Sequence, residues 1–428
     1  MMSGDGKALV GLLLIPVILV SSLPVSTPAR VAPDTYALGT AYNSERKIVV
    51  DPSGSIYIAY STLAKNGSYF VEVAVSRDGG DSWSDLPGVP SAANSSRSAL
   101  ALAPSGAVDL VWTEGAPVRS QIYFSSFSGG SWSPKILLSN SSYYSGYPSI
   151  VVDSKGGAHV VWYGFDGTYY EIYYTRSNGT TWTPPHNLST LKEDSLNPSI
   201  AVDAAGNLYV TWYAEVSRYF QIYYAEFKGN WSVPVAITTR LADSTESSLA
   251  IQPDGKVNIV WTTAINNIDQ VFMMTGQDGL WGPKAQLTNG SDYAANPTQT
   301  FAPNGTAIVF WTAAGDVYGC AVRGSCAPYL VYSTGYNSYP SAEWPVRAGS
   351  GGVLLMWTSS SPTENGTEET VLFANVVAPG TSNAPLLAYG LITALAFVAI
   401  VIMIVRKLPK KNRIQSVGLN LSNRTELR

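Results

Sequence analysis

The sequence predicts an all-β protein: a seven-bladed β-propeller of four-stranded antiparallel blades, closed by an N-terminal strand and followed by one C-terminal transmembrane helix. Three observations predict it. Similar copies of a hairpin-like stretch occur along the chain, and seven of them follow one another at intervals of about 50 residues. Near the end of the chain, an uncharged apolar segment precedes a basic C-terminus. Charged residues make up only 13% of the chain, which suits an all-β extracellular protein.

The clearest copies of the hairpin are PSIVVDSKGGAHVVW, from Pro148 to Trp162, and PSIAVDAAGNLYVTW, from Pro198 to Trp212. Weaker copies end at Tyr60, Trp112, Trp261, Trp311 and Trp357. Each copy joins two alternating apolar runs through a short turn that contains Gly or other turn-forming residues. Alternation around such a turn is typical of a β-hairpin.

Two further strands complete the repeating unit. In the unit that starts at Pro148 they are YEIYYTRS and, after a turn, TWTPPHNLS. A single sheet of this kind cannot bury both faces, whereas seven packed radially can, so we expect the aromatic residue that closes each second strand to lie between blades as core. Prolines in the fourth strand fit an outer edge. An open solenoid is the alternative architecture.

The two ends of the array favour closure. The seventh unit supplies three strands, the last being EETVLFANV from Glu368, and no fourth strand follows Val377. Tyr36–Thr40 precedes the first unit, and we expect it to complete the last blade and to hide both edges. The propeller is therefore assigned to residues 36–377.

The termini predict secretion and anchoring. Residues 1–30, with Lys7 before an apolar run from Ala8 to Val20, indicate a signal peptide or an N-terminal anchor. A linker, 378–384, leads to the predicted transmembrane helix, 385–405, and a basic tail, 406–428. The positive-inside rule places that tail in the cytoplasm and the propeller outside, as a single-pass protein of the plasma membrane.

The charge and the cysteine and histidine content between the two terminal segments limit the kinds of ligand that the chain can bind. Residues 31–405 carry a net charge of −11, which argues against nucleic acid as a ligand. Cys320 and Cys326 enclose a short loop, for which we expect a local disulfide rather than a metal or redox pair. His159 and His186 lie in different strands, so no metal site or cofactor is expected.

Sequons for N-glycosylation accompany the predicted external location and would make the chain a glycoprotein. They are Asn66, Asn94, Asn140, Asn178, Asn187, Asn230, Asn289, Asn304 and Asn365.

One turn carries a family resemblance. Ser76-Arg77-Asp78-Gly79-Gly80-Asp81-Ser82-Trp83 resembles the Asp box (BNR repeat), S-x-D-x-G-x-[ST]-W, of sialidase-like propellers. The residues that match the motif are Ser76, Asp78, Gly80 and Trp83. A second copy has the same spacing, with Thr175, Gly179 and Trp182 at matching positions and Ser177 at the position of the Asp. The resemblance implies a fold, and it implies that the box is structural and lies on the face opposite any active site.

Ligands of propellers usually bind where the loops between blades meet around the central channel. The repeat places one residue of each unit there, just before its first strand: Glu45, Arg97, Tyr147, Asn197, Glu246, Asn296 and Tyr339. The loops between second and third strands add Arg119, Asp166, Glu215 and Arg218. For any one of these residues, an ordinary solvated loop position is the alternative interpretation.

A sialidase-like enzyme would need arginines that clamp a carboxylate and a tyrosine nucleophile with a glutamate. Glu246 and Tyr339 are the candidates for that pair, and Arg97, Arg119 and Arg218 for the clamp. The F/Y-R-I-P motif of the family is absent, with Arg46-Lys47-Ile48-Val49 near its place, and seven units depart from the six blades of sialidases.

We therefore predict a binding or adhesion module for a glycan or a surface protein, acting through the channel mouth. An exo-sialidase-like glycoside hydrolase and a structural component of the cell envelope are the alternatives. The sequence assigns no catalytic residue and leaves the oligomeric state open.

Overall fold

The computed structural model describes residues 27–32, 40, 42, 44–239, 241–333, 335–343, 352–363 and 366–376. The chain divides into two units, Met1–Thr381 and Ser382–Arg428, and all the described residues belong to the first. The predicted helix 385–405 and its basic tail lie outside the described residues. Among the residues described, no helix combines the length and apolarity needed to cross a bilayer.

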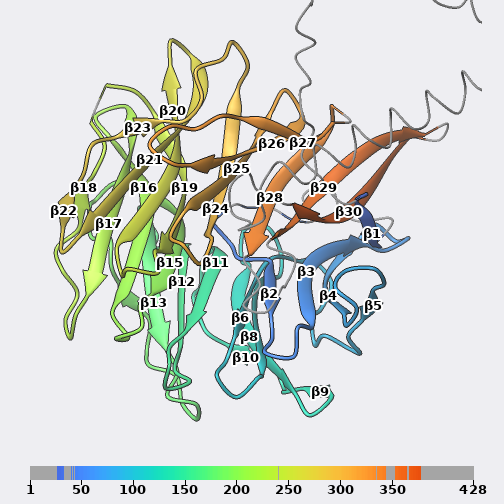
Figure 1. The fold of residues 1–428 in the computed structure, drawn as a ribbon. Helices are drawn as coiled ribbons and strands as arrows, with labels where there is room; N and C mark the ends of the chain where they lie inside the picture. Colours follow the sequence, from blue (N-terminus) through green and yellow to red (C-terminus); the bar gives the residue numbers. More distant parts are fainter. Residues whose placement is uncertain are drawn as a thin grey trace, which may run out of the picture. The chain divides into compact units, whose positions relative to one another are not determined.

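The first unit is a propeller of seven antiparallel sheets (Figure 1). Blade 1 comprises β2 (Ile48–Val50), β3 (Ile56–Leu63), β4 (Tyr69–Ser76) and β5 (Ser84–Asp85). Blade 2 comprises β6 (Ser95–Leu102), β7 (Val108–Glu114), β8 (Gln121–Ser128), β9 (Ser131–Trp132) and β10 (Ile136–Leu137). Blade 3 comprises β11 (Ser145–Val152), β12 (Ala158–Phe165), β13 (Tyr170–Arg176) and β14 (His186–Asn187).

Blades 4 to 7 follow the same order. Blade 4 comprises β15 (Ser195–Val202), β16 (Leu208–Val216), β17 (Tyr219–Phe227) and β18 (Val235–Ala236), and blade 5 comprises β19 (Ser244–Ile251), β20 (Val257–Ile265), β21 (Ile268–Gln277), β22 (Leu280–Trp281) and β23 (Ala285–Gln286). Blade 6 comprises β24 (Ala294–Phe301), β25 (Ala307–Ala313), β26 (Asp316–Val322) and β27 (Tyr329–Tyr332), and blade 7 comprises β28 (Asn337–Glu343), β29 (Val353–Thr363), β30 (Gly366–Val376) and β1 (Ala29–Ala32).

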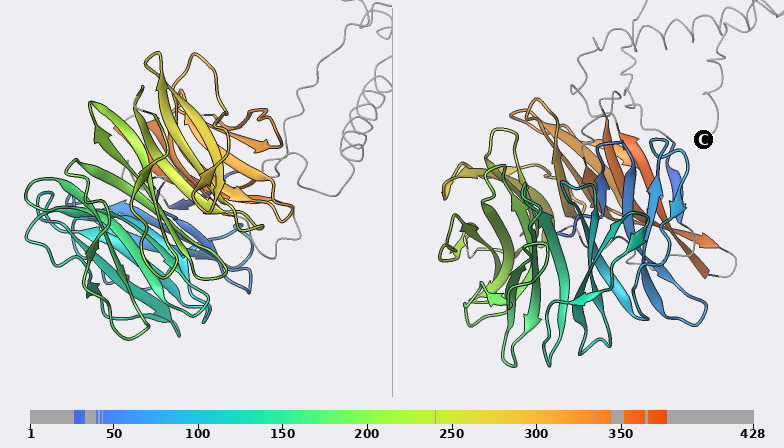
Figure 2. Two further views of the ribbon diagram at one scale, coloured as in Figure 1. Left: turned by 90° about the vertical axis from the view of Figure 1, so that its left-hand side faces the viewer. Right: turned by 90° about the horizontal axis from the view of Figure 1, so that it is seen from below.

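An N-terminal strand closes the ring, as predicted, but it is not Tyr36–Thr40. β1, Ala29–Ala32, pairs antiparallel with β30, and the blue and red ends of the chain lie side by side in Figures 1 and 2. Arg30 forms an ion pair with Glu368 and Ala32 is buried, which explains why this segment fits the edge. Of the predicted strand only Thr40 is described, and its backbone N–H donates to the Thr358 hydroxyl of blade 7 at 3.1 Å. The propeller thus begins inside the segment 1–30 that was assigned to the signal or anchor.

The predicted interblade core is confirmed. Each second strand places its closing aromatic in a cluster shared with the preceding blade, and seven such clusters run around the ring, one for each interface. These residues are Tyr60, Trp112, Trp162, Trp212, Trp261, Trp311 and Trp357, all 0–3% exposed. Blade 7 meets blade 1 through Met356 and Tyr60, so the architecture is a closed ring and not a solenoid.

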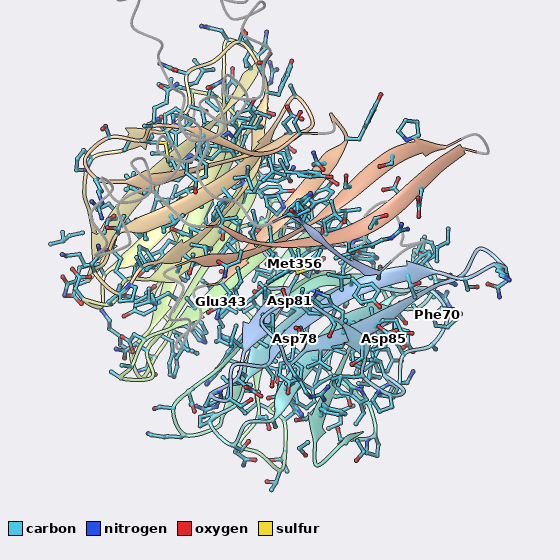
Figure 3. All side chains as sticks on the ribbon, turned by 45° about the vertical axis from the view of Figure 1, so that its right-hand side comes forward. Phe70, Asp78, Asp81, Asp85, Glu343 and Met356 are labelled. Carbon is cyan, nitrogen blue, oxygen red and sulfur yellow. A yellow bond between two sulfur atoms is a disulfide. The ribbon has the colours of Figure 1, made fainter. Side chains whose placement is uncertain are left out.

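The Asp box forms the turn between β4 and β5 (Figure 3). Asp78 accepts the Ser82 N–H at 2.9 Å, and hydrogen bonds from Ser82 hold the pKa of Asp78 well below its usual range. Trp83 does more than fill its own turn, because its ring packs on Phe373 of blade 7 at 5.1 Å. Trp182, Trp231 and Trp281 contact the third strands of their preceding blades in the same way. The box therefore joins neighbouring blades.

Prolines, which lack a backbone N–H, interrupt some of the outer strands and keep them short. Pro134 separates β9 from β10 and Pro283 separates β22 from β23, since proline cannot donate to a ladder. In blade 6, Cys320 and Cys326 form a disulfide beside the outer strand.

Most of the predicted glycosylation sequons have an exposed asparagine: Asn66, Asn94, Asn140, Asn178, Asn230, Asn289 and Asn304. Asn187 is half-buried, and Asn365 lies outside the described residues.

Asp109 on β7 makes the stability of the propeller depend on pH. Its side chain is 6% exposed, and burial raises its pKa to about 6, although a hydrogen bond from Ser126 opposes the shift. A carboxyl with a raised pKa lowers stability as the pH rises through the folded-state value. We expect Asp109→Asn to raise the free energy of unfolding by about 2–3 kcal/mol at pH 8 and by almost nothing at pH 3.5. Urea unfolding at both pH values checks this, with exposed Asp81→Asn as control; an equal gain at both would contradict it.

Candidate functional site at the channel mouth

The seven predicted ring positions share a backbone feature that the sequence analysis missed. Six of them lie inside the inner strand of their blade, as its third residue, at a break in register with the second strand. All six have a left-handed backbone with φ between 49° and 57°: Arg97, Tyr147, Asn197, Glu246, Asn296 and Tyr339. Glu45 instead precedes β2.

This arrangement corrects the expected boundary, because the strands begin two residues before the ring positions. A left-handed residue interrupts the two-residue alternation, so the apolar pattern becomes visible only after the bulge. A positive φ is uncommon for any residue with a side chain, and a strained backbone of this kind is concentrated at functional sites. A left-handed residue stands at the same position of the inner strand in six blades, so it is a regular feature of this end of the channel and not a local irregularity.

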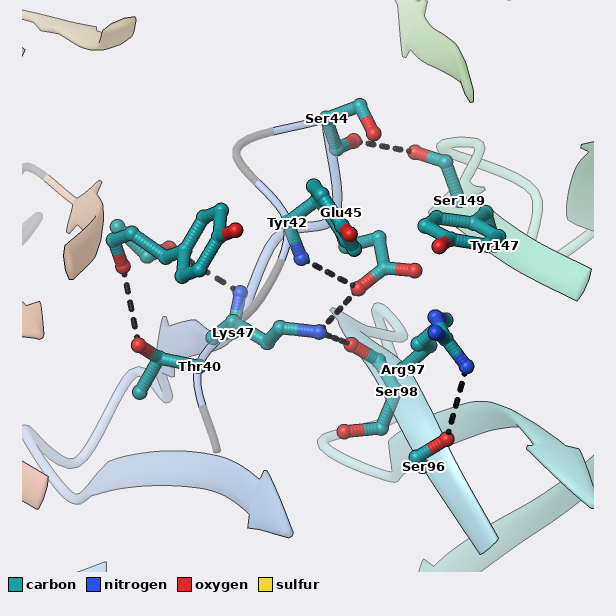
Figure 4. Close-up of polar contacts among 12 residues, drawn as sticks. Thr40, Tyr42, Ser44, Glu45, Lys47, Ser96, Arg97, Ser98, Tyr147 and Ser149 are labelled. Carbon is teal, nitrogen blue, oxygen red and sulfur yellow. Dashed lines mark hydrogen bonds and ion pairs between the residues drawn. The ribbon is translucent and has the colours of Figure 1, made fainter. Parts of the chain in front are cut away.

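A segment ahead of β2 occupies the middle of the mouth (Figure 4). The Ser149 hydroxyl of blade 3 donates to the Ser44 carbonyl at 3.0 Å, and the Lys47 N–H donates to the Ser341 hydroxyl of blade 7 at 3.2 Å. Contacts to blades on both sides place Tyr42, Ser44, Glu45 and Lys47 across the centre. Sequence reasoning identified Glu45 only, since the apolar pattern carries no signal for the others.

Glu45 and Lys47 form an ion pair whose side chains are both 0% exposed. Lys47 also donates to the Ser98 carbonyl, and the Tyr42 N–H donates to Glu45 at 2.9 Å. Burial raises the pKa of Glu45 and lowers that of Lys47, while the attraction between them opposes both shifts. Glu45 forms its ion pair with Lys47, whereas its attraction to Arg97 acts through charge alone, without an ion pair between them.

Arg97 stacks on an aromatic ring in place of an acid. Its guanidinium carbon lies 4.4 Å from the ring centre of Tyr147, and its buried Nε has no hydrogen-bond partner among the residues that the structure describes. Burial by itself lowers the pKa of Arg97, but Tyr147, Tyr144 and Glu45 more than offset this, so the net shift is upward. Among the described residues, no carboxylate lies within ion-pair distance of it, which leaves the cation able to accept an anionic ligand.

Tyrosines surround this cation. Tyr42 packs on Tyr147 at 4.8 Å and on Tyr339 at 4.9 Å, which joins blade 3 to blade 7 across the mouth. Tyr147 also stacks on Tyr163 of β12 at 4.9 Å. Tyr42, Tyr147 and Tyr339 thus form an aromatic platform at the centre of the mouth.

Glu246 and Tyr339 both reach the mouth, but their environment opposes a nucleophilic tyrosine. Glu246 accepts the Asn296 N–H at 2.9 Å and the Thr262 hydroxyl at 3.1 Å, and burial raises its pKa. Burial and the nearby Tyr42 and Glu246 raise the pKa of Tyr339, so the phenolate is disfavoured.

The remaining candidates stay at the periphery. Arg119 and Arg218 are exposed on their loops, and neither arginine forms an ion pair with a described residue. Glu215 is also exposed, but it lies within β16, where it pairs with Phe220, and not on the predicted loop. Asp166 accepts N–H groups of its own turn, from Thr168 and Tyr169. His159 pairs with Asp153 and Tyr174 inside blade 3, and the described residues contain no group of three or more His, Cys, Asp and Glu suited to a metal.

A cavity of about 460 Å³ opens at the other end of the channel. Its walls are mainly the apolar ends of the inner strands, including Val50, Leu102, Val152 and Ile251, with Arg46 and Glu343 as its charged groups. Those two groups lie 3.8 Å apart and compensate each other. Unlike Arg97 at the mouth, the charged groups of this cavity therefore form an ion pair with each other.

Comparisons with known proteins identify the fold. No family model matches the chain, and no curated protein matches its sequence. Among solved structures, an ulvan lyase of family PL25 bound to -[GlcA(1-4)Rha3S]- is similar at TM-score 0.56 and 11% identity, covering 82% of this chain and 96% of that one. The polysaccharide lyase Uly1 is similar at TM-score 0.53 and 12% identity, covering 80% and 92%. The NanB sialidase of Streptococcus pneumoniae is a more distant neighbour, at TM-score 0.46 and 12% identity, covering 83% and 72%.

Proposed function

We propose that the chain is a carbohydrate-binding propeller held at the cell surface, and that its ligand binds at the channel mouth. The observation that carries the proposal is the platform of Tyr42, Tyr147 and Tyr339 around Arg97, whose charge no described carboxylate neutralises. Aromatic faces pack on the apolar faces of sugar rings, while the amides and carboxylate around them bind hydroxyl groups.

Two points support a sugar over other ligands. The acidic body of the chain repels nucleic acid. The fold accommodates a polysaccharide in at least one other protein, since the ulvan lyase structure contains a bound -[GlcA(1-4)Rha3S]- chain. The signal or anchor at residues 1–30 and the span at 385–405 would hold this platform outside the plasma membrane.

Arg97→Ala is expected to weaken binding of the carbohydrate by about thirtyfold or more, because a buried charged hydrogen bond to the ligand is lost. The full-length chain in detergent would be screened on a glycan array of neutral and acidic sugars, and the best glycan titrated by calorimetry. Arg77→Ala, in the exposed Asp-box turn of the opposite face, is the matched control.

Arg97→Lys keeps the charge but loses the planar stack on Tyr147, so it should restore binding only in part. An empty array, or equal affinities for Arg97→Ala and Arg77→Ala, would remove the mouth as a binding site. An empty array together with ordered lattices of the protein would favour a structural role in the cell envelope.

A further inference from the structure

Seven aromatic residues form a continuous strip from the centre of the mouth to the rim of blade 3. Ring centres along it are 4.8–5.6 Å apart between successive members. In order from the rim, this aromatic strip consists of Tyr143, Phe165, Tyr170, Tyr163, Tyr147, Tyr42 and Tyr339. Tyr143 is 47% exposed, and only Tyr163 is buried.

The repeat does not require these aromatic residues. The residue after the closing aromatic is Tyr163 in blade 3 and Tyr213 in blade 4, but it is Ser or Thr in the other five blades. Two positions further on, blade 3 has Phe165 where the other blades have Leu, Gly, Glu or small residues. Tyr147, Tyr163 and Tyr170 pack in the core between blades 3 and 4. Phe165 and the exposed Tyr143 are not part of that core, and the other blades form without an aromatic residue at the position of Phe165, so folding does not account for the outer end of the strip.

We infer that the mouth binds an extended acidic oligosaccharide, which runs outward along the aromatic strip and sets a carboxylate or sulfate against Arg97. This inference rests on the proposed carbohydrate-binding function. One sugar ring covers about one aromatic face. Tyr143, Phe165 and Tyr170 at the rim are exposed or half-buried, so a chain of sugars can contact them and still reach Arg97, whereas a terminal sugar cannot do both. A bidentate guanidinium contact with the anion supplies the charge pairing that the described residues leave unmade at Arg97.

The strip also predicts how affinity depends on ligand length. We would titrate the full-length chain with galacturonic acid, its tetramer and its octamer, and with chondroitin sulfate fragments of matched length. Affinity should rise at least tenfold from monomer to octamer. Tyr143→Ala should weaken octamer binding about three- to tenfold and leave monomer binding unchanged, since Tyr143 lies at the far end of the strip.

Matched variants separate the strip from general effects. Tyr143→Phe keeps the ring face and should restore octamer binding. Tyr293→Ala removes a comparably exposed tyrosine, 60% exposed, from the loop before blade 6 and should change nothing. Both sites are on the surface, so thermal unfolding should be unaltered in these variants.

Three results would overturn the inference. The first is equal affinity for monomer and octamer, and the second is a Tyr143→Ala variant that weakens both alike. The third is binding of a neutral oligosaccharide or a proline-rich peptide in preference to both acidic series. Each of these could occur while Arg97→Ala still abolished binding of some glycan, so the proposed function and the extended acidic chain fail separately. Preference for the carboxylated over the sulfated series, or the reverse, identifies the anion that Arg97 accepts.

Discussion

Lys47→Met is expected to lower the free energy of unfolding by about 3–5 kcal/mol, because it leaves the Glu45 carboxyl buried without its cation. Both side chains are fully buried, so water cannot replace the lost partner. Lys47 also donates to the Ser98 carbonyl of blade 2, and that bond is lost as well. The measurement is urea unfolding at pH 7, followed by tryptophan fluorescence.

The double variant Glu45→Gln/Lys47→Met provides the control. It removes both charges, and replacing a buried pair by neutral groups is often close to neutral for stability. The single variant should also lose more stability as the pH rises, since burial raises the pKa of Glu45 and the unpaired carboxyl must ionise at a cost. If the single and double variants were equally unstable, the loss would come from packing and not from charge.

Trp212→Ala is expected to destabilise the propeller by about 3–5 kcal/mol, the cost of a large cavity in a core. Trp212 is 0% exposed and belongs to the cluster between blades 3 and 4, together with Val161, Tyr163 and Tyr223. Loss of its ring leaves a cavity among the residues that pack blade 3 against blade 4. Thermal and urea unfolding of the full-length chain measure the effect.

Trp212→Phe should cost less than half as much, since Trp212 Nε1 has no hydrogen-bond partner among the described residues. Trp112→Phe is the informative comparison, because Trp112 Nε1 donates to Glu114 at 3.0 Å and its loss strips a partner from a buried carboxylate. Equal costs for the two phenylalanine variants would show that the indole hydrogen bond contributes little.

Periodicity made the blades predictable. Alternation, turn residues and the recurring Trp162 or Trp212 are local signals, and each repeat carries them in the same order. The closing strand was misplaced because Ala29–Ala32 is short and has no strong pattern. Its position depends on backbone pairing with β30, at the other end of the propeller sequence.

The sequence repeat was sufficient to predict the seven ring positions, but not their backbone conformation or their neighbours. The sequence showed that Arg97 and Tyr339 occupy equivalent places in their units. It could not show that a left-handed bulge holds each of them, or that Tyr42 lies between Tyr147 and Tyr339. Bulges arise from a mismatch between two paired strands, so they belong to the pair and not to either segment alone.

The amino-acid sequence was sufficient to predict seven sheets with aromatic residues buried between them, because strand periodicity and turn chemistry act over a few neighbouring residues. Three features became apparent only in the folded structure: the strand that closes the ring, the burial of Lys47 against the Ser98 carbonyl of blade 2, and the strip formed by tyrosines from blade 3, the Tyr42 segment and blade 7. Those features depend on contacts between residues far apart in the chain, and ring closure is what brings such residues together.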